Sequence, residues 1–259
     1  MGTSSLYHGL KKAILLPSDY VEGDGSTPEV LPSETQEEHP IPEVQPTIGG
    51  AKNSLTRSMG NKKHIRRAIR TYVSALGGHE KATKQIRAAR KVTSKMVVLF
   101  SGGSATIKRQ LEAQGVQVEH KTIKEICREI CYSLMLPGAT REDSVVNCAL
   151  IETFENFAEN EGLADLTWEN LTESLLIKLE CLFITNAIVS KLLNDASLGM
   201  IRKAQSTLDY LKAEKDIKDI VSDVVELHAP EYLNQANTSN DVEQLVHDLY
   251  DKCYQILEN

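Results

Sequence analysis

Aromatic residues are scarce in this sequence, and proline is almost confined to one end of it. Phe, Trp and Tyr make up 5% of the 259 residues, and Trp occurs once. Six of the eight prolines lie in the first fifty residues, so the long stretch that follows, rich in Leu, Ile, Ala, Lys and Glu, has few helix breakers. Such a composition is typical of helices. We therefore predict a mainly α fold, a helical bundle with few strands.

Cysteine and histidine lack the spacings that build covalent or metal frameworks. The five cysteines are odd in number and include no Cys-x-x-Cys pair, which argues against disulfides and a zinc site. Cys127 and Cys131 stand beside Ile126 and Ile130 and are expected to be core thiols. The seven histidines show no His-Glu-x-x-His pattern. We expect no metal site and a reducing, cytoplasmic location.

No apolar run is long enough to suggest a membrane segment. The most apolar stretch, 175–193, is interrupted by Lys178, Glu180 and Lys191, which are costly in hydrocarbon but ordinary on a buried helix. Near the N-terminus, the apolar segment 13–16 is too short for a signal-peptide core. The sequence therefore predicts neither export nor contact with a membrane.

Motifs of common enzyme classes are also missing. Segment 101–108 resembles a phosphate loop, but it lacks the closing Gly-Lys-Ser/Thr and does not follow a convincing buried strand. No Gly-x-Ser-x-Gly elbow occurs in the sequence. We therefore expect a protein that is not an enzyme and that binds no cofactor.

The first fifty residues have the composition of a disordered segment. They contain eight acidic residues, two lysines and too little apolar surface to offset the entropy lost on ordering. The polar stretch from Gly49-Gly50 to Asn61 is interpreted as a linker. We expect a flexible, acidic, Pro-rich tail over residues 1–58 and a helical domain over 59–259, basic over 59–100 and acidic over 101–259.

A 3.6-residue period begins after the linker. Apolar residues such as Ile65, Ile69 and Tyr72 form one stripe, and cations fill the other side. Gly77-Gly78 is a natural helix stop. A second helical run continues to Phe100 with further cations on its outer face.

The remaining sequence predicts several more helices. Thr140 and Thr167 are interpreted as N-caps, the second opening a long, central apolar helix. Beyond Gly199 we expect two or three helices: one segment over 200–227, either continuous or broken near Glu214, and another over 241–257. Ala229-Pro230 and Asn237-Thr238-Ser239-Asn240 are expected to separate them.

Basic charge is concentrated in one part of the chain. Residues 51–95 contain 13 Lys and Arg against Glu80 alone, whereas residues 96–259 contain 14 basic and 27 acidic residues. Thirteen cations are enough to hold several phosphates, but they also suit acidic helices or an acidic partner protein. Tyr72 is the one aromatic residue among them, so no stacking platform is evident. The candidate contact residues are Lys62, Lys63, Arg66, Arg67, Arg70, Lys84, Arg87, Lys91 and Lys95.

The sequence begins Met1-Gly2, and a small second residue permits removal of the initiator methionine. The freed α-amine titrates at about pH 7.7–8.0, well below lysine at about 10.4, so it is suited to acylation. Leu6 stands where myristoylation prefers Ser or Thr. Gly2 is thus either an N-terminal residue without a special role or a site that another protein modifies.

Five segments, taken in order, are distinctive as a set: Met1-Gly2-Thr3-Ser4-Ser5, Tyr72-Val73-Ser74-Ala75-Leu76-Gly77-Gly78, Leu136-Pro137-Gly138-Ala139-Thr140, Ala149-Leu150-Ile151-Glu152-Thr153 and Leu166-Thr167. Together they resemble the QatB family of the bacterial Qat anti-phage system. The resemblance covers most of residues 1–9 and 62–195. It departs from the usual family start at Leu6 and at His8-Gly9-Leu10, and it includes no catalytic motif.

The resemblance implies a non-enzymatic component that acts with the ATPase QatA, the QueC-like enzyme QatC and the TatD-like nuclease QatD. It also implies that QatC joins a 7-deazaguanine covalently to Gly2. In doing so QatC would bind the segment that contains Thr3, Ser4, Ser5 and Tyr7. The helical domain would then be a scaffold. The alternative is a nucleic-acid-binding module whose basic helices, 62–95, position the nuclease.

Overall fold

The computed structural model describes residues 46–119, 121–160, 167, 170–204, 206–237, 239 and 241–259. Over these ranges the regular structure is helical, and the β pairing is limited to an isolated bridge between Thr122 and Thr167. The prediction of a mainly α fold is therefore confirmed. None of the helices in these ranges combines the length and apolar character needed to cross a bilayer.

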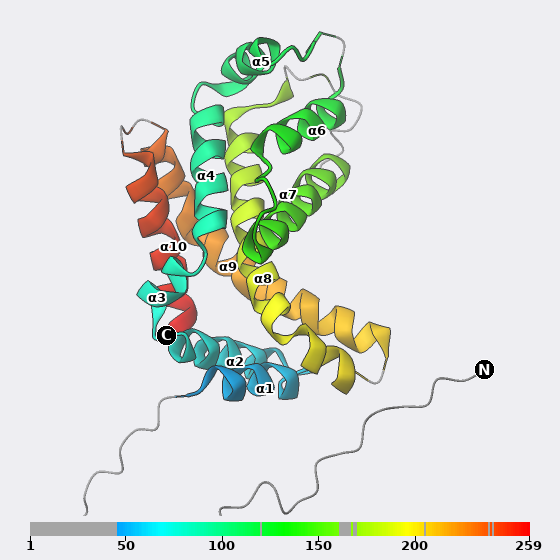
Figure 1. Cartoon of the computed structure of the whole chain (residues 1–259), viewed down its shortest axis with the longest axis vertical. Helices are drawn as coiled ribbons and strands as arrows, with labels where there is room; N and C mark the ends of the chain where they lie inside the picture. The colour runs from blue at the N-terminus through cyan, green and yellow to red at the C-terminus, as the bar shows by residue number, and fades with distance from the viewer. Residues whose placement is uncertain are drawn as a thin grey trace, which may run out of the picture. The chain divides into compact units, whose positions relative to one another are not determined.

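The helices are shown in Figure 1. In chain order they are α1 (Ile48–Arg57), α2 (Lys62–Ala75), α3 (His79–Lys84), α4 (Arg87–Phe100), α5 (Gly103–Ala113), α6 (Ile123–Leu134), α7 (Arg141–Asn160), α8 (Glu173–Lys203), α9 (Thr207–Ala236) and α10 (Val242–Glu258).

The 31-residue helix α8 is the centre of the bundle, as its apolar sequence predicts. It packs against α7, α9, α1 and α4, while α10 packs against α9, α4, α3 and α2. Figure 1 shows α1 and α2 lying across one end of the bundle, with α5 and α6 at the opposite end. A helix that is apolar around much of its circumference is stable only when neighbours cover it on several sides.

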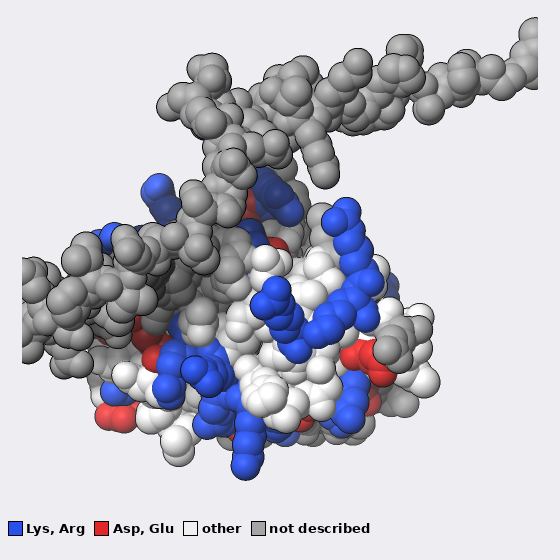
Figure 2. Space-filling model, turned by 90° about the horizontal axis from the view of Figure 1, so that it is seen from below, with Lys and Arg blue, Asp and Glu red and all other residues white. Residues whose placement is uncertain are grey.

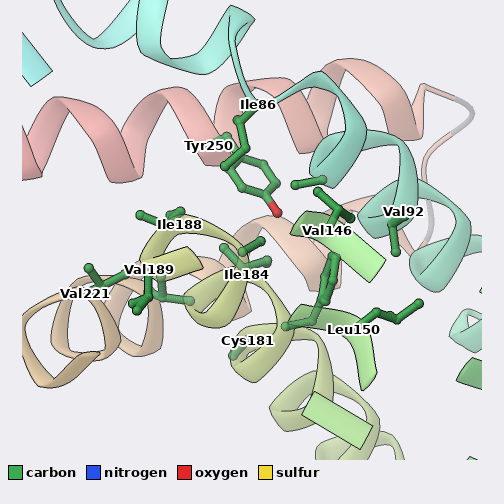
Figure 3. Close-up of a cluster of buried hydrophobic side chains, with 14 of the residues drawn as sticks. Ile86, Val92, Val146, Leu150, Cys181, Ile184, Ile188, Val189, Val221 and Tyr250 are labelled. Atoms are coloured by element: carbon green, nitrogen blue, oxygen red, sulfur yellow. The ribbon is translucent and has the colours of Figure 1, made fainter. Parts of the chain in front are cut away.

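One hydrophobic core runs through the helical part, from Ala51 in α1 to Leu257 in α10. In the close-up of Figure 3, Val146 of α7, Ile184 of α8 and Tyr250 of α10 belong to the same buried cluster. The basic and acidic parts of the domain therefore share a core, because helices from both contribute to it.

Helix α2 confirms the predicted amphipathic pattern. Its apolar stripe is buried, including Ile65, Ile69 and Tyr72. Asn61 caps the first turn by accepting hydrogen bonds from two backbone N–H groups. The helix ends where predicted, because Gly77 has a φ of 95°, which disfavours any residue with a Cβ.

The linker prediction is wrong over α1. Thr47 caps this helix, and its hydroxyl accepts a hydrogen bond of 3.1 Å from the Gly50 N–H. Ala51 and Leu55 are buried in the shared core. Part of the predicted tail, 1–58, thus belongs to the helical body, because two apolar side chains one turn apart suffice to pack a short polar helix.

The two N-cap predictions had different outcomes. Thr140 caps α7 as expected, and it exchanges reciprocal hydrogen bonds of 3.0 and 3.1 Å with Asp143. The N-cap of α8 is Thr172 and not Thr167, whose hydroxyl instead donates to Asn170. Both threonines satisfy the local capping preference, so the choice between them depends on where the helix packs.

Two predicted helix breaks are wrong, because Gly199 lies inside α8 and Pro230 lies inside α9. A Cβ at position 199 would lie 2.5 Å from Oγ1 of Thr56, so the glycine allows α1 to approach α8 closely. The neighbours of Pro230, including Ala229 and Leu233, are buried. Their burial offsets the cost of about 3 kcal/mol for a proline in a helix. The second basic run, conversely, is divided into α3 and α4 near Ile86.

Candidate functional site

The five predicted contact residues of α2 all have exposed side chains: Lys62, Lys63, Arg66, Arg67 and Arg70. They are exposed because α2 buries its apolar stripe against α1, α9 and α10. Figure 2 views this end of the molecule and shows Lys and Arg side chains gathered on it, with few acidic side chains between them.

The α2 cations are almost free of internal ion pairs. Lys62 Nζ lies 3.7 Å from Oδ2 of Asp219. Within the described part of the chain, no carboxylate pairs with Lys63, Arg66, Arg67 or Arg70. The sequence explains this, since no Asp or Glu occurs between residues 43 and 80. The prediction left open whether these cations face acidic helices of the same fold, and the structure shows that most of them do not.

The positive surface continues onto α1 through Arg57, which is exposed in the last turn of that helix. Nζ of Lys203, at the end of α8, donates a hydrogen bond of 3.0 Å to the Arg57 carbonyl oxygen and so lies at the border of the surface. We call the following exposed side chains the basic face: Arg57, Lys62, Lys63, Arg66, Arg67 and Arg70.

The four other predicted contact residues are exposed and lie on helices other than α2. Lys84 ends α3, which packs against α10, and Arg87 begins α4. Lys91 and Lys95 line a cavity of about 440 Å³ whose other walls come from α5, α6 and α10. The cations that lie close in sequence are therefore distributed over different surfaces of the molecule.

The predicted recognition residues of the N-terminus, Gly2, Thr3, Ser4, Ser5 and Tyr7, lie outside the described residues. No contact or geometry is assigned to them.

The described residues contain no group of three or more His, Cys, Asp and Glu side chains suited to a metal. Cys127 and Cys131 are buried, and desolvation raises the pKa of both thiols. A raised pKa disfavours the thiolate that metal binding and nucleophilic attack require. The prediction that these two residues are core thiols is confirmed.

A model of one protein family, described as Qat anti-phage system associated protein QatB, matches residues 77–257. The match covers more than half of the chain. The chain belongs to the QatB family. Comparison with curated proteins and with solved structures found no match. Membership of the QatB family gives the chain a role in the Qat anti-phage defence system.

The QatB match begins at Gly77, so it includes α3 to α10 and begins after α2. Two groups that sequence reasoning missed lie within it. Nδ1 of His79 is 2.9 Å from Oδ1 of Asp251, and the His79 backbone N–H donates to Glu258. The hydrogen bond to Asp251 is the main reason that the pKa of His79 is raised. No sequence pattern predicts this pairing, because the two partners are 172 residues apart.

The second missed group of this QatB-family chain is Glu180 in α8. Its side chain is 1% exposed, and within the described structure neither carboxylate oxygen has a hydrogen-bond partner. Desolvation raises its pKa to about 8. The sequence did contain a signal, since Glu180 interrupts the most apolar stretch of the chain.

A third feature within the QatB match is a set of exposed apolar side chains at the end of α8 and the start of α9, which follow one another in the chain. Ile201 is 56% exposed, Leu208 76% and Leu211 51%. We call these three residues the apolar tip. Exposed large apolar side chains that gather in one place are characteristic of sites where another protein binds.

Proposed function

We propose that the chain is the non-enzymatic Qat component that carries an N-terminal modification, with Gly2 as the acceptor of a 7-deazaguanine attached by the QueC-like enzyme QatC. The observation that carries the proposal is family membership, together with the start Met1-Gly2-Thr3-Ser4-Ser5. In this arrangement the enzyme binds the segment that contains Thr3, Ser4, Ser5 and Tyr7.

The proposed chemistry is the formation of an amide. After removal of Met1, the neutral amine of Gly2 attacks the carboxyl carbon of a deazaguanine acid that ATP has activated. The new C–N bond replaces the bond to the activating group, which leaves, and the amine nitrogen loses a proton. The α-amine suits this step because a sizeable fraction of it is neutral at physiological pH, unlike lysine.

The helical body has the proposed role of an assembly scaffold for the other Qat components. The apolar tip supports this role, because side chains such as Leu208 gain free energy when a partner protein covers them. The basic face has a different composition, and its partner is argued separately below.

Intact-mass measurement tests the acceptor proposal. Coexpression with QatC should yield a chain that lacks Met1 and is heavier by one deazaguanine amide, located at Gly2 by fragmentation. Gly2→Ala still permits removal of Met1, so loss of the adduct in this variant reports on the glycine itself. Gly9→Ala is the matched control and should be modified like the wild type.

Phage protection provides the functional test. Gly2→Ala should abolish protection together with the adduct, whereas Gly9→Ala should retain both. A wild-type chain that remains unmodified beside active QatC, yet still protects cells, would refute the acceptor role.

A further inference from the structure

We propose that the basic face binds the phosphate backbone of duplex nucleic acid. The inference goes beyond the modification of Gly2 and does not depend on it. It rests on the exposure of the α2 cations, on their lack of ion pairs within the described structure and on the side chains that surround them.

The geometry of α2 places its cations in a short row. Lys63, Arg66, Arg67 and Arg70 occupy positions i, i+3, i+4 and i+7, which share one side of a helix over about 10 Å. A DNA duplex carries one negative charge per about 1.7 Å of its axis, so several phosphates lie within reach of such a row. The unpaired cations need not break internal ion pairs in order to bind them.

The composition of the basic face favours a phosphate backbone over a protein partner. Protein interfaces have an apolar core from which charged residues are depleted. Among the described residues of α1 and α2, the exposed large hydrophobic side chain is Ile48, at the start of α1 and away from Arg66 and Arg70 in sequence. The more exposed apolar side chains, such as Leu208, belong to other helices.

The single aromatic residue of α2 favours a duplex over a single strand. Proteins that bind single strands stack bases on exposed aromatic rings. Tyr72 is fully buried, and its hydroxyl is hydrogen-bonded to Asp195, so it offers no stacking surface. Binding through cations alone should therefore be independent of base sequence and strongly dependent on salt.

The test compares two double charge reversals in the full-length chain. Arg66→Glu/Arg70→Glu changes two exposed residues of the basic face that are four positions apart. Lys91→Glu/Lys95→Glu changes two exposed residues with the same spacing on α4, so the two variants have the same net charge. Binding to a labelled DNA duplex of mixed sequence is measured by fluorescence anisotropy over a range of salt concentrations. An unlabelled DNA duplex, an RNA duplex, a DNA single strand and poly-glutamate serve as competitors.

The wild type should bind the duplex at low salt with a slope of log affinity against log salt of about −4. Arg66→Glu/Arg70→Glu should lower the affinity at least about tenfold and reduce the slope by about 2, whereas Lys91→Glu/Lys95→Glu should change the affinity less than about threefold. If the DNA duplex and the RNA duplex both displace the labelled probe, the protein recognises the phosphate backbone that the two share. If only one of them does so, that nucleic acid is the target.

Three results would overturn the inference: no duplex binding at low salt, an equal loss in both variants, or competition by poly-glutamate as strong as that by the duplex. The last result would assign the basic face to an acidic protein. Because the mutated residues are exposed and unpaired within the described structure, circular dichroism should show unchanged helicity. The assay uses the unmodified chain, so failure of the Gly2 proposal leaves it unaffected.

Discussion

The hydroxyl group of Tyr72 donates a hydrogen bond of 2.5 Å to Oδ2 of Asp195 and thereby joins α2 to α8. Nζ of Lys191 lies 3.2 Å from the same oxygen, and Nζ of Lys52 lies 3.8 Å from Oδ1. Burial opposes ionisation of Asp195, but the hydrogen bond from Tyr72 and the two lysines hold its pKa below the ordinary value. Helices α1, α2 and α8 thus meet at one carboxylate, which anchors the hairpin that carries the basic face.

Removal of this hydroxyl should destabilise the fold. Tyr72→Phe leaves Asp195 without its closest donor, and a hydrogen bond to a charged group contributes about 1.5–3 kcal/mol. Urea denaturation should show a loss of that size in the free energy of unfolding. Tyr132→Phe, at an exposed position of α6, is the control and should change it by less than about 0.5 kcal/mol. Equal effects of the two substitutions would show that the hydrogen bond contributes nothing.

Glu180 should make the protein less stable as the pH rises. Its pKa is about 8 in the folded chain against an ordinary value of 4.5, so between these values the folded state keeps a proton that the unfolded state has lost. The unfolding free energy then falls with pH, by at most about 1.4 kcal/mol per unit for this group.

Glu180→Gln removes the titration and should flatten that decline, so the stability of the variant relative to the wild type should rise between about pH 4.5 and pH 8 and stay constant above pH 8. Urea denaturation at several pH values measures the difference. Glu231→Gln, at an exposed position of α9, should follow the wild-type curve. Parallel curves for wild type and Glu180→Gln would mean that the carboxyl group is solvated.

His79 should also contribute stability that is lost as the pH rises. Because its hydrogen bond to Asp251 raises its pKa above 6.5, the contribution is full below the unfolded pKa and is lost as the pH rises through the folded pKa. The difference in unfolding free energy between wild type and His79→Gln should be larger at about pH 6 than at about pH 9. His64→Gln, at an exposed position of α2, is the control. A difference that does not vary with pH would refute the ion pair.

Gly199→Ala should reveal the close approach of α1 to α8. Alanine favours a helix by about 1 kcal/mol over glycine, but its Cβ would meet Oγ1 of Thr56 at 2.5 Å. We expect Gly199→Ala to lower the melting temperature of the wild type and to raise that of the Thr56→Ala variant. The four proteins of this double-mutant cycle should give a coupling of about 1 kcal/mol, and purely additive effects would contradict the contact.

Local sequence was sufficient to predict those features of a helix that depend only on residues a few positions apart. The apolar stripe of α2, its end at Gly77 and the Thr140–Asp143 cap of α7 were predicted correctly, because periodicity, positive φ and capping act over a few positions. The same reasoning failed at Gly199 and Pro230. Both residues are unfavourable in an isolated helix, and the packing of distant segments keeps them within one.

The sequence by itself determined that the chain is helical and that its net positive charge is concentrated between residues 51 and 95. Only the tertiary structure decided which cations share a surface, since the fold separates Lys91 and Lys95 from Arg66 and Arg70. It also decided the pairing of Tyr72 with Asp195. The physical reason is that charge and helix propensity belong to local sequence, whereas a surface forms only when residues far apart in the chain pack together.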